Sequence, residues 1–324
     1  MLSYNIIFEK IRFALENLNF TRKPEELYNP ISYTLSLGGK RLRPVLCLMA
    51  CDMFGGKIED AVPAALGLEI FHNFTLLHDD IMDEAPIRRG KQSVYKKWNT
   101  NVAILSGDTM MALAYGQIME TPENIHSQVF QVFNQTAIEV CEGQQYDMDF
   151  ETAENVDIED YLEMIRLKTA VLLAGSLKIG AMIGGAVTED AKNLYRFGEN
   201  IGIAFQLKDD LLDVFSDEQK FGKKTGGDIL TNKKTYLYLK AFELAKGEIL
   251  ETLNILFDGN QNNDTDKIKG VIEVYEQLNI KQLTDDLIDK YYQRAMSSLE
   301  KVNVDDSRKM ELIKFAEGLK GREY

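Results

Sequence analysis

Apolar residues recur at helical spacing along almost the whole chain, and clear strand-like alternation is absent. Thr121, Thr188 and Thr284, each followed by an acidic residue or a proline, are typical helix starts. These signals predict about ten to twelve helices. The longest cover residues 61–84, 102–120, 124–142, 158–185 and 188–215. The pattern therefore predicts an all-α bundle of mostly antiparallel helices.

The composition favours one globular domain over residues 1–324. The chain is 45% apolar and 27% charged, and it has no Pro/Ser-rich or low-complexity linker. Its net charge of −14 argues against nucleic-acid and anionic-membrane partners. Residues 170–187 are apolar but carry Lys178 and several glycines, which indicates a closely packed core helix rather than a membrane span. The first residues of the chain lack the apolar block of a signal peptide.

The cysteines point to a reducing compartment. Cys47, Cys51 and Cys141 show no metal-binding spacing, and we expect buried, reduced thiols in a cytoplasmic protein.

Two acidic motifs stand near the ends of long apolar segments. Each places carboxylates at positions i, i+1 and i+4: Asp79, Asp80 and Asp83 in the first, and Asp209, Asp210 and Asp213 in the second. Side chains at i and i+4 share a helix face, where like charges repel. A divalent cation removes that repulsion, and clustered carboxylates suit Mg²⁺, which also binds substrate phosphates. One such motif alone fits a solvated helix end equally well, but two copies indicate metal binding.

A di-iron carboxylate site is the alternative metal centre. It would need Glu-x-x-His pairs on facing helices. Glu69 with His72 supplies only one such pair, so the sequence does not support this alternative.

Three basic clusters interrupt the acidic composition, and two of them directly follow the acidic motifs. They are Lys40, Arg41 and Arg43 after Gly38-Gly39; Arg88, Arg89 and Lys91; and Lys220, Lys223, Lys224, Lys233 and Lys234. Arginine and lysine are the usual ligands of phosphate oxygens. A basic loop beside each acidic motif therefore predicts a diphosphate held by both Mg²⁺ and cations.

Histidine placement adds a candidate ligand. His72 lies two helical turns before Asp79 and only about 20° away around the helix, so it can face the same ligand. His78 lies about 100° away and fits a satisfied core residue as well.

Taken in order, these motifs resemble the trans-isoprenyl diphosphate synthases, also called polyprenyl synthetases. The resemblance runs from Gly38 to Thr235. It rests on Gly-Gly-Lys-Arg-Leu-Arg-Pro at 38–44, the Asp79 motif, Arg88-Arg89-Gly90, Gly107-Asp108, Gly143-Gln144 with Asp147, Lys168-Thr169, Gln206 with the Asp209 motif, Lys223 and Lys233.

The resemblance implies an isoprenoid-synthase bundle around a central cavity, active as a homodimer. It implies head-to-tail condensation of isopentenyl diphosphate with a dimethylallyl, geranyl or farnesyl diphosphate, in the presence of three Mg²⁺ ions. The implied isopentenyl diphosphate site is Lys40, Arg43, His72 and Arg89. The implied metal ligands are Asp79, Asp83 and Asp209, with Asp80, Asp210 and Asp213 in the same catalytic motifs. The implied diphosphate-binding cations are Arg88, Lys168, Lys223 and Lys233, and the implied groups beside the carbocation are Thr169 and Gln206, with Gln144 and Asp147 nearby.

Product length is predicted from the segment before Asp79. Phe74 and Phe71 lie about 7.5 and 12 Å back along the helix and about 60° apart, so they can form the floor of the pocket. Simple core packing is the alternative. In the family, an aromatic five residues before the first Asp goes with geranylgeranyl or farnesyl products, and the small Thr75 favours geranylgeranyl.

Two other functions compete with this one. A class I terpene cyclase shares the first acidic motif, but it would carry a different second motif and no isopentenyl diphosphate site. A non-catalytic partner subunit would have lost metal ligands, whereas all six aspartates are present.

Overall fold

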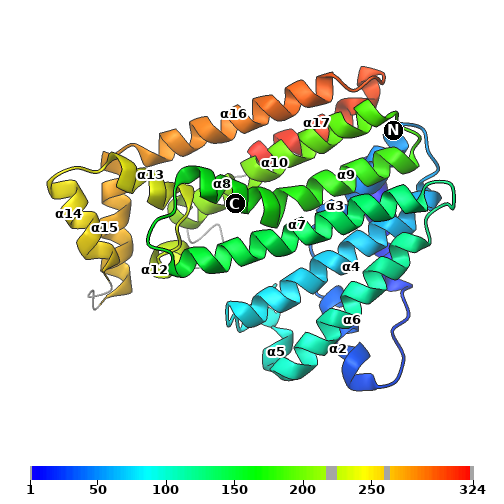
Figure 1. The fold of residues 1–324 in the computed structure, drawn as a ribbon, viewed down its shortest axis with the longest axis horizontal. Helices are drawn as coiled ribbons and strands as arrows, with labels where there is room; N and C mark the ends of the chain where they lie inside the picture. Colours follow the sequence, from blue (N-terminus) through cyan, green and yellow to red (C-terminus); the bar gives the residue numbers. More distant parts are fainter. Residues whose placement is uncertain (1, 217–224, 259–262, 322–324) are drawn as a thin grey trace. The chain divides into compact units, whose positions relative to one another are not determined.

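The computed structural model describes residues 2–216, 225–258 and 263–321. Within these ranges the chain forms sixteen α-helices, one π-helical turn and one two-stranded hairpin (Figure 1). The hairpin pairs β1 (Ile87–Arg88) antiparallel with β2 (Lys91–Gln92). The predicted all-α fold is therefore confirmed. The predicted helix number was too low, in part because two of the helices have only four residues and are too short to show an apolar period.

By its internal contacts the chain divides into two compact units. Unit 1 comprises residues 1–136, 172–195 and 301–311, and unit 2 comprises residues 137–171, 196–300 and 312–324. Four helices contribute residues to both units: α7 (His126–Thr152), α9 (Val171–Ile183), α10 (Thr188–Phe215) and α17 (Asp306–Lys320). Whether the whole chain behaves as one domain stays a prediction.

Unit 1 is built around helix α4, which packs against α3 and α6 and runs beside α6 in Figure 1. Besides its share of α7, α9, α10 and α17, unit 1 contains six helices: α1 (Tyr4–Glu16), α2 (Glu25–Ser36), α3 (Leu42–Met53), α4 (Ile58–Met82), α5 (Val94–Lys97) and α6 (Thr100–Met119). Helix α3 is apolar on all sides and is buried along almost its whole length, as expected of a helix enclosed by others. Burying α3 and α4 fixes the position of the α4 C-terminus.

Unit 2 packs around the C-terminal half of α10. Its other elements are α8 (Ile158–Ile165), the π-turn η1 (Arg166–Ala170), α12 (Gly227–Leu230), α13 (Tyr236–Leu244), α14 (Glu248–Phe257), α15 (Asp264–Gln277) and α16 (Ile280–Glu300). Buried Leu207 and Leu211 of α10 join Tyr161, Leu237 and Tyr275 in one apolar cluster. This cluster anchors the helix that carries the second acidic motif.

Glycines permit close helix approach, as the sequence indicated. A Cβ on Gly180 of α9 would lie 1.9 Å from the carbonyl oxygen of Cys47 in α3, and one on Gly175 would lie 2.7 Å from Thr136 Oγ1 in α7. The helix predicted over 158–185 is, however, interrupted by η1 and ends at Ile183. Among the described residues, no helix combines the length and the apolar character needed to cross a membrane.

Three local predictions were wrong. Thr284 lies inside α16, where its hydroxyl donates to the carbonyl of Ile280, so it does not cap a helix. Thr121 lies in the turn before α7, which begins at His126. Cys47 and Cys51 are buried as expected, but Cys141 is exposed, because it stands one position beyond the buried Val140 on α7.

Candidate active site

The first acidic motif occupies the C-terminal turn of α4. Asp83 caps the helix, and its N–H donates to the carbonyl of Asp79 at 2.9 Å. The helical turn on which the i, i+4 argument depends is therefore formed. Asp83 is exposed and Asp79 is half-buried.

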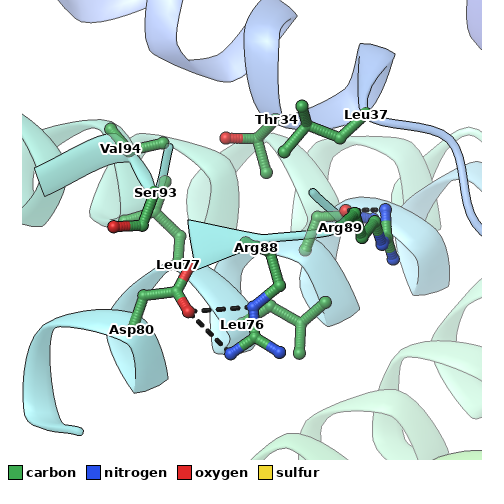
Figure 2. Close-up of a pocket in the computed structure, with 10 residues that line it drawn as sticks. Thr34, Leu37, Leu76, Leu77, Asp80, Arg88, Arg89, Ser93 and Val94 are labelled. Atoms are coloured by element: carbon green, nitrogen blue, oxygen red, sulfur yellow. Dashed lines mark hydrogen bonds and ion pairs between the residues drawn. The ribbon is translucent and has the colours of Figure 1, made fainter. Parts of the chain in front are cut away.

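Asp80 differs from its neighbours because it is buried and bound to Arg88. Arg88 Nε donates to Asp80 Oδ1 at 2.8 Å, and Arg88 Nη2 lies 2.6 Å from Asp80 Oδ1 and 3.4 Å from Asp79 Oδ2. Figure 2 shows this pair between the β1 strand and the end of α4, with Leu76 and Leu77 beside it. Burial raises the pKa of Asp80, although the Arg88 guanidinium opposes that rise. The basic cluster of Arg88, Arg89 and Lys91 thus meets the first acidic motif through Arg88.

The donor set at the α4 tip fits Mg²⁺. Asp79 and Asp83 offer carboxylate oxygens one helical turn apart, and Mg²⁺ is usually held by one or two carboxylates together with waters and substrate phosphates. In the described part of the chain, no group of three acidic, histidine or cysteine side chains converges on one point.

Arg43 and His72 form the second part of the unit 1 site. Arg43 Nη1 donates to His72 Nε2 over 3.1 Å, so the histidine accepts on Nε2. Burial, with Arg43, Arg89 and other nearby arginines, holds the pKa of His72 well below its usual value, so its ring is neutral near pH 7. Burial also lowers the pKa of Arg43 to about 10. The buried Arg43 Nε has no hydrogen-bond partner among the described residues, which leaves a donor for a ligand.

The glycine-rich loop before α3 is fastened to α4 and to the hairpin. Arg41 precedes α3 in a left-handed backbone conformation, and its guanidinium binds Glu69 of α4 and the carbonyl of Leu35. Arg89 Nη1 donates to the carbonyl of Gly38, and a Cβ on Gly39 would lie 2.9 Å from the Arg89 guanidinium carbon. Gly39 therefore permits the contact that seats Arg89 against the loop.

The remaining predicted residues of unit 1 take varied positions. Lys40 is exposed in the loop, and its carbonyl accepts from the Tyr4 hydroxyl. Phe71 is fully buried, with its ring 5.5 Å from Phe74 and 5.4 Å from Phe133.

Phe74 is also buried, and its ring centre lies 4.8 Å from that of His78. Thr75 donates to the carbonyl of His72. His78 Nε2 lies 3.2 Å from the carbonyl of Ile104 and its ring packs on Gly107, so it is a satisfied packing residue.

In unit 2, a π-turn presents Lys168 and Thr169. The Val171 N–H donates to the carbonyl of Arg166, five residues back, which widens the helix by one residue at this point. Gly143 and Gly202 lie against the turn: a Cβ on Gly143 would meet Lys168 N at 2.2 Å, and one on Gly202 would meet Ala170 Cα at 2.5 Å.

Asp147 holds two lysines together. Lys168 Nζ lies 2.6 Å from Asp147 Oδ2, and Lys233 Nζ lies 3.6 Å from Asp147 Oδ1. Although burial alone would raise the pKa of Asp147, Lys233 and Lys168 lower it below its ordinary value. Asp147 therefore stays ionised and keeps two predicted diphosphate-binding cations side by side. Lys220, Lys223 and Lys224 lie outside the described residues, so the predicted role of Lys223 stays a prediction.

A hydrogen-bonded chain leads from Thr169 to a buried tyrosine. Thr169 Oγ1 donates to Gln206 Oε1 at 3.1 Å, and Gln206 Nε2 donates to Asp210 Oδ1 at 2.9 Å. Tyr161, which is 1% exposed, donates its hydroxyl to Asp210 Oδ2. Asp210 is thus an internal anchor that fixes which end of the Gln206 amide faces Thr169.

The other aspartates of the second motif diverge in role. Asp209 is half-buried on α10. Asp213, one turn later, accepts from the N–H of Asp228 at 2.9 Å, and its carbonyl accepts from Gly226. Burial, reinforced by Asp210 and Asp213, raises the pKa of Asp228 to about 7. Gln144, predicted to bind substrate, keeps a buried Nε2 with no hydrogen-bond partner among the described residues.

Sequence reasoning missed the parts of the site that act through other residues. Glu69 and Asn73 were not recognised as partners of the arginines. The charge of Glu69 inside the apolar run of α4 was a usable signal, because buried charges are nearly always paired. Asp228 carried a weaker signal, as the acidic member of a lysine-rich segment. Tyr161 carried none.

Comparison with known proteins shows which family has this sequence and fold. The sequence profile of the polyprenyl synthetase family matches residues 24–275. A geranylgeranyl diphosphate synthase of Methanosarcina mazei is 37% identical over 314 residues, covering 96% of this chain and 94% of that protein. A crystal structure of a geranylgeranyl pyrophosphate synthase matches with a TM-score of 0.94 and 42% identity over 100% of both chains.

The geranylgeranyl pyrophosphate synthetase of Pyrococcus horikoshii matches with a TM-score of 0.88 and 32% identity, covering 98% of this chain and 95% of that one. The fold of these proteins therefore matches this chain over nearly its whole length. The chain therefore belongs to the polyprenyl synthetase family.

Proposed function

We propose that this protein condenses isopentenyl diphosphate with an allylic diphosphate, head to tail, and releases a short all-trans prenyl diphosphate. The observation that carries the proposal is the shared position of cations and carboxylates: Arg88 contacts both Asp79 and Asp80 at the α4 tip. A diphosphate bound through a metal and through protein cations needs this arrangement. The similar geranylgeranyl diphosphate synthases support the choice of reaction.

The chemistry follows from charge. Ionisation of the allylic C–O bond leaves an allylic cation and a diphosphate whose charge grows as the bond breaks. Arg88, Lys168 and Lys233 would stabilise that charge. A unit charge pair at 4 Å is worth about 1 kcal/mol in water but about 4 kcal/mol at an effective dielectric near 20. Thr169 and Gln206 present oxygen atoms whose dipoles favour the cation.

The second substrate would bind through Arg43, His72, Arg89 and Lys40. Because His72 is neutral and accepts from Arg43, it orients the guanidinium rather than adding charge. The isopentenyl double bond then attacks the allylic cation, and the released diphosphate accepts the proton that is lost. No protein base is required for this step.

Members of this family are divalent-metal-dependent prenyl synthases. We propose Mg²⁺, with three ions bound beside the diphosphate and with Asp79, Asp83 and Asp209 as the protein ligands. Bound Mg²⁺ would neutralise charge on the leaving group. If these carboxylates serve one ion cluster, the Asp79→Asn and Asp209→Asn losses in kcat will be strongly non-additive in the double variant. Additive losses would contradict a shared cluster.

Geranylgeranyl diphosphate is the favoured product and farnesyl diphosphate the alternative. Both Phe74 and Phe71 are buried one turn apart on α4, which suits a pocket floor and also suits simple packing. Homodimerisation and a cytoplasmic location are further parts of the proposal that derive from the family resemblance. Light scattering on the purified protein tests the dimer.

The decisive assay incubates purified protein with Mg²⁺, isopentenyl diphosphate and each of the dimethylallyl, geranyl and farnesyl primers, and then sizes the products. We expect a C20 diphosphate and loss of turnover when the metal is chelated. Cyclic hydrocarbons would instead favour a terpene cyclase. A lack of product with every primer would favour a non-catalytic partner subunit.

A further inference from the structure

A buried carboxylate stands within the arginine cluster of unit 1. Glu69 of α4 is 1% exposed and forms an ion pair with Arg41, whose side chain is 7% exposed. The amide of Asn73, which is fully buried, donates to Glu69 Oε1 at 2.9 Å. The second carboxylate oxygen, Oε2, is buried and has no hydrogen-bond partner among the described residues.

The position of this carboxylate is unexpected for a phosphate-binding region. A fixed negative charge repels an anionic ligand, so a site selected only for attraction would exclude it. Three guanidinium groups (Arg41, Arg43 and Arg89) also repel one another when no ligand is bound: Arg89 disfavours the charged form of Arg43, and Glu69 favours it. Glu69 therefore balances charge in the cluster before any anion arrives.

Contacts run from Glu69 to both sides of the cluster. On one side, its ion pair with Arg41 holds the residue at which the loop enters α3 in a left-handed conformation, two positions before Arg43. On the other side, Asn73 Oδ1 accepts from Arg89 Nη1 at 3.5 Å, and the same nitrogen binds the carbonyl of Gly38. One carboxylate thus connects the loop, α4 and the hairpin arginine.

We propose that Glu69 is a positioning residue for the isopentenyl diphosphate subsite, acting on Arg41 directly and on Arg89 through Asn73. The inference rests on the proposed function, because the proposed function assigns isopentenyl diphosphate to that subsite. Glu69 does not touch the ligand in this proposal. It keeps two guanidinium groups in place so that little ordering remains to be done on binding.

The neutral variant Glu69→Gln separates positioning from simple electrostatics, because the two predict opposite signs. If Glu69 only repels the anion, its neutralisation strengthens isopentenyl diphosphate binding. If it positions the arginines, the loss of its charge-assisted hydrogen bonds weakens that binding by about tenfold. If Glu69 positions the arginines, the allylic KM stays unchanged. A general structural defect would change the allylic KM as well.

The experiment measures both KM values and kcat in steady state, the Kd of isopentenyl diphosphate by calorimetry, and the unfolding temperature. Asn73→Ala keeps the Glu69–Arg41 ion pair but removes the hydrogen bonds from Asn73 to Glu69 and to Arg89, and it is expected to raise the isopentenyl diphosphate Kd by about threefold, because the Arg89 contact is long. Asp190→Asn is the matched control: Asp190 is a buried carboxylate of the same unit that accepts from the Asn303 N–H. It should leave the Kd unchanged.

A folded Glu69→Gln protein with an equal or lower isopentenyl diphosphate Kd overturns the inference. If Glu69→Gln does not fold, an unchanged Kd in Asn73→Ala overturns it instead. A wild-type protein that binds isopentenyl diphosphate but makes no product contradicts the proposed reaction alone, and the Kd comparison still decides the role of Glu69. A wild-type protein that does not bind isopentenyl diphosphate overturns both.

Discussion

Gly143→Ala should displace the π-turn that presents Lys168 and Thr169. The added Cβ would lie 2.2 Å from Lys168 N and 2.7 Å from both Leu167 C and Lys168 Cα. All three are backbone atoms, so no side-chain rotation relieves the overlap. Ordinary contact begins near 3.4 Å, so the π-turn and α7 must separate by about 1.2 Å.

That displacement is large compared with the contacts it disturbs. The Thr169–Gln206 hydrogen bond is 3.1 Å long, and a further ångström takes it beyond the 3.5 Å range of hydrogen bonding. A misplacement of about 1 Å in catalytic groups typically costs about 10²-fold in rate. Overpacking costs about 1–3 kcal/mol, partly offset by the gain of about 0.5–1 kcal/mol from replacing a helical glycine. We therefore expect a large loss in kcat with a fall of only a few degrees in unfolding temperature.

The assay is steady-state condensation at a temperature well below the unfolding transition, with thermal unfolding measured in parallel. Gly318→Ala is the matched control, because Gly318 lies in α17 and a Cβ there has no neighbour within 4 Å. It should be active and slightly more stable. Wild-type kcat and an undiminished unfolding temperature in Gly143→Ala would refute the close approach of α7 to the π-turn.

Three further substitutions test the site. Tyr161→Phe removes the hydroxyl that binds the buried Asp210, so we expect a loss of about 1–3 kcal/mol in unfolding free energy and a lower kcat with little change in either KM. A drop in stability with full kcat would show that the Tyr161 hydroxyl does not affect catalysis. Phe74→Ala should lengthen the products, as sized by chromatography, and an unaltered chain length in a folded protein would remove Phe74 as the pocket floor. Because the folded pKa of Asp228 is raised to about 7 from an unfolded value near 3.9, its contribution to stability is present below about pH 4 and is lost as the pH rises through 7. In metal-free buffer, wild type should therefore lose more unfolding free energy than Asp228→Asn between pH 5 and pH 8, and parallel pH profiles would contradict this.

The sequence alone determined the helical fold and the candidate residues for metal and phosphate binding. Helical periodicity is a local property, so α10 was predicted at residues 188–215 with the bounds that the structure shows. Both acidic motifs and the basic clusters were legible because metal and phosphate binding need particular residue types at particular spacings. The i, i+4 placement of Asp79 and Asp83 needed only one turn of helix.

Only the tertiary structure decided which of these residues pair with other side chains of the protein. Asp80 and Asp210 hold the same position in their motifs, yet Asp80 is bound to Arg88, whereas Asp210 is bound to Tyr161 and Gln206. Such partners lie up to 49 residues apart in the chain, and no local pattern encodes their meeting. The π-turn is likewise set by glycines of two other helices, which relieve a steric conflict that exists only after packing. Local periodicity and residue chemistry can be read along the chain, whereas desolvation and the pairing of buried charges depend on neighbours that folding supplies.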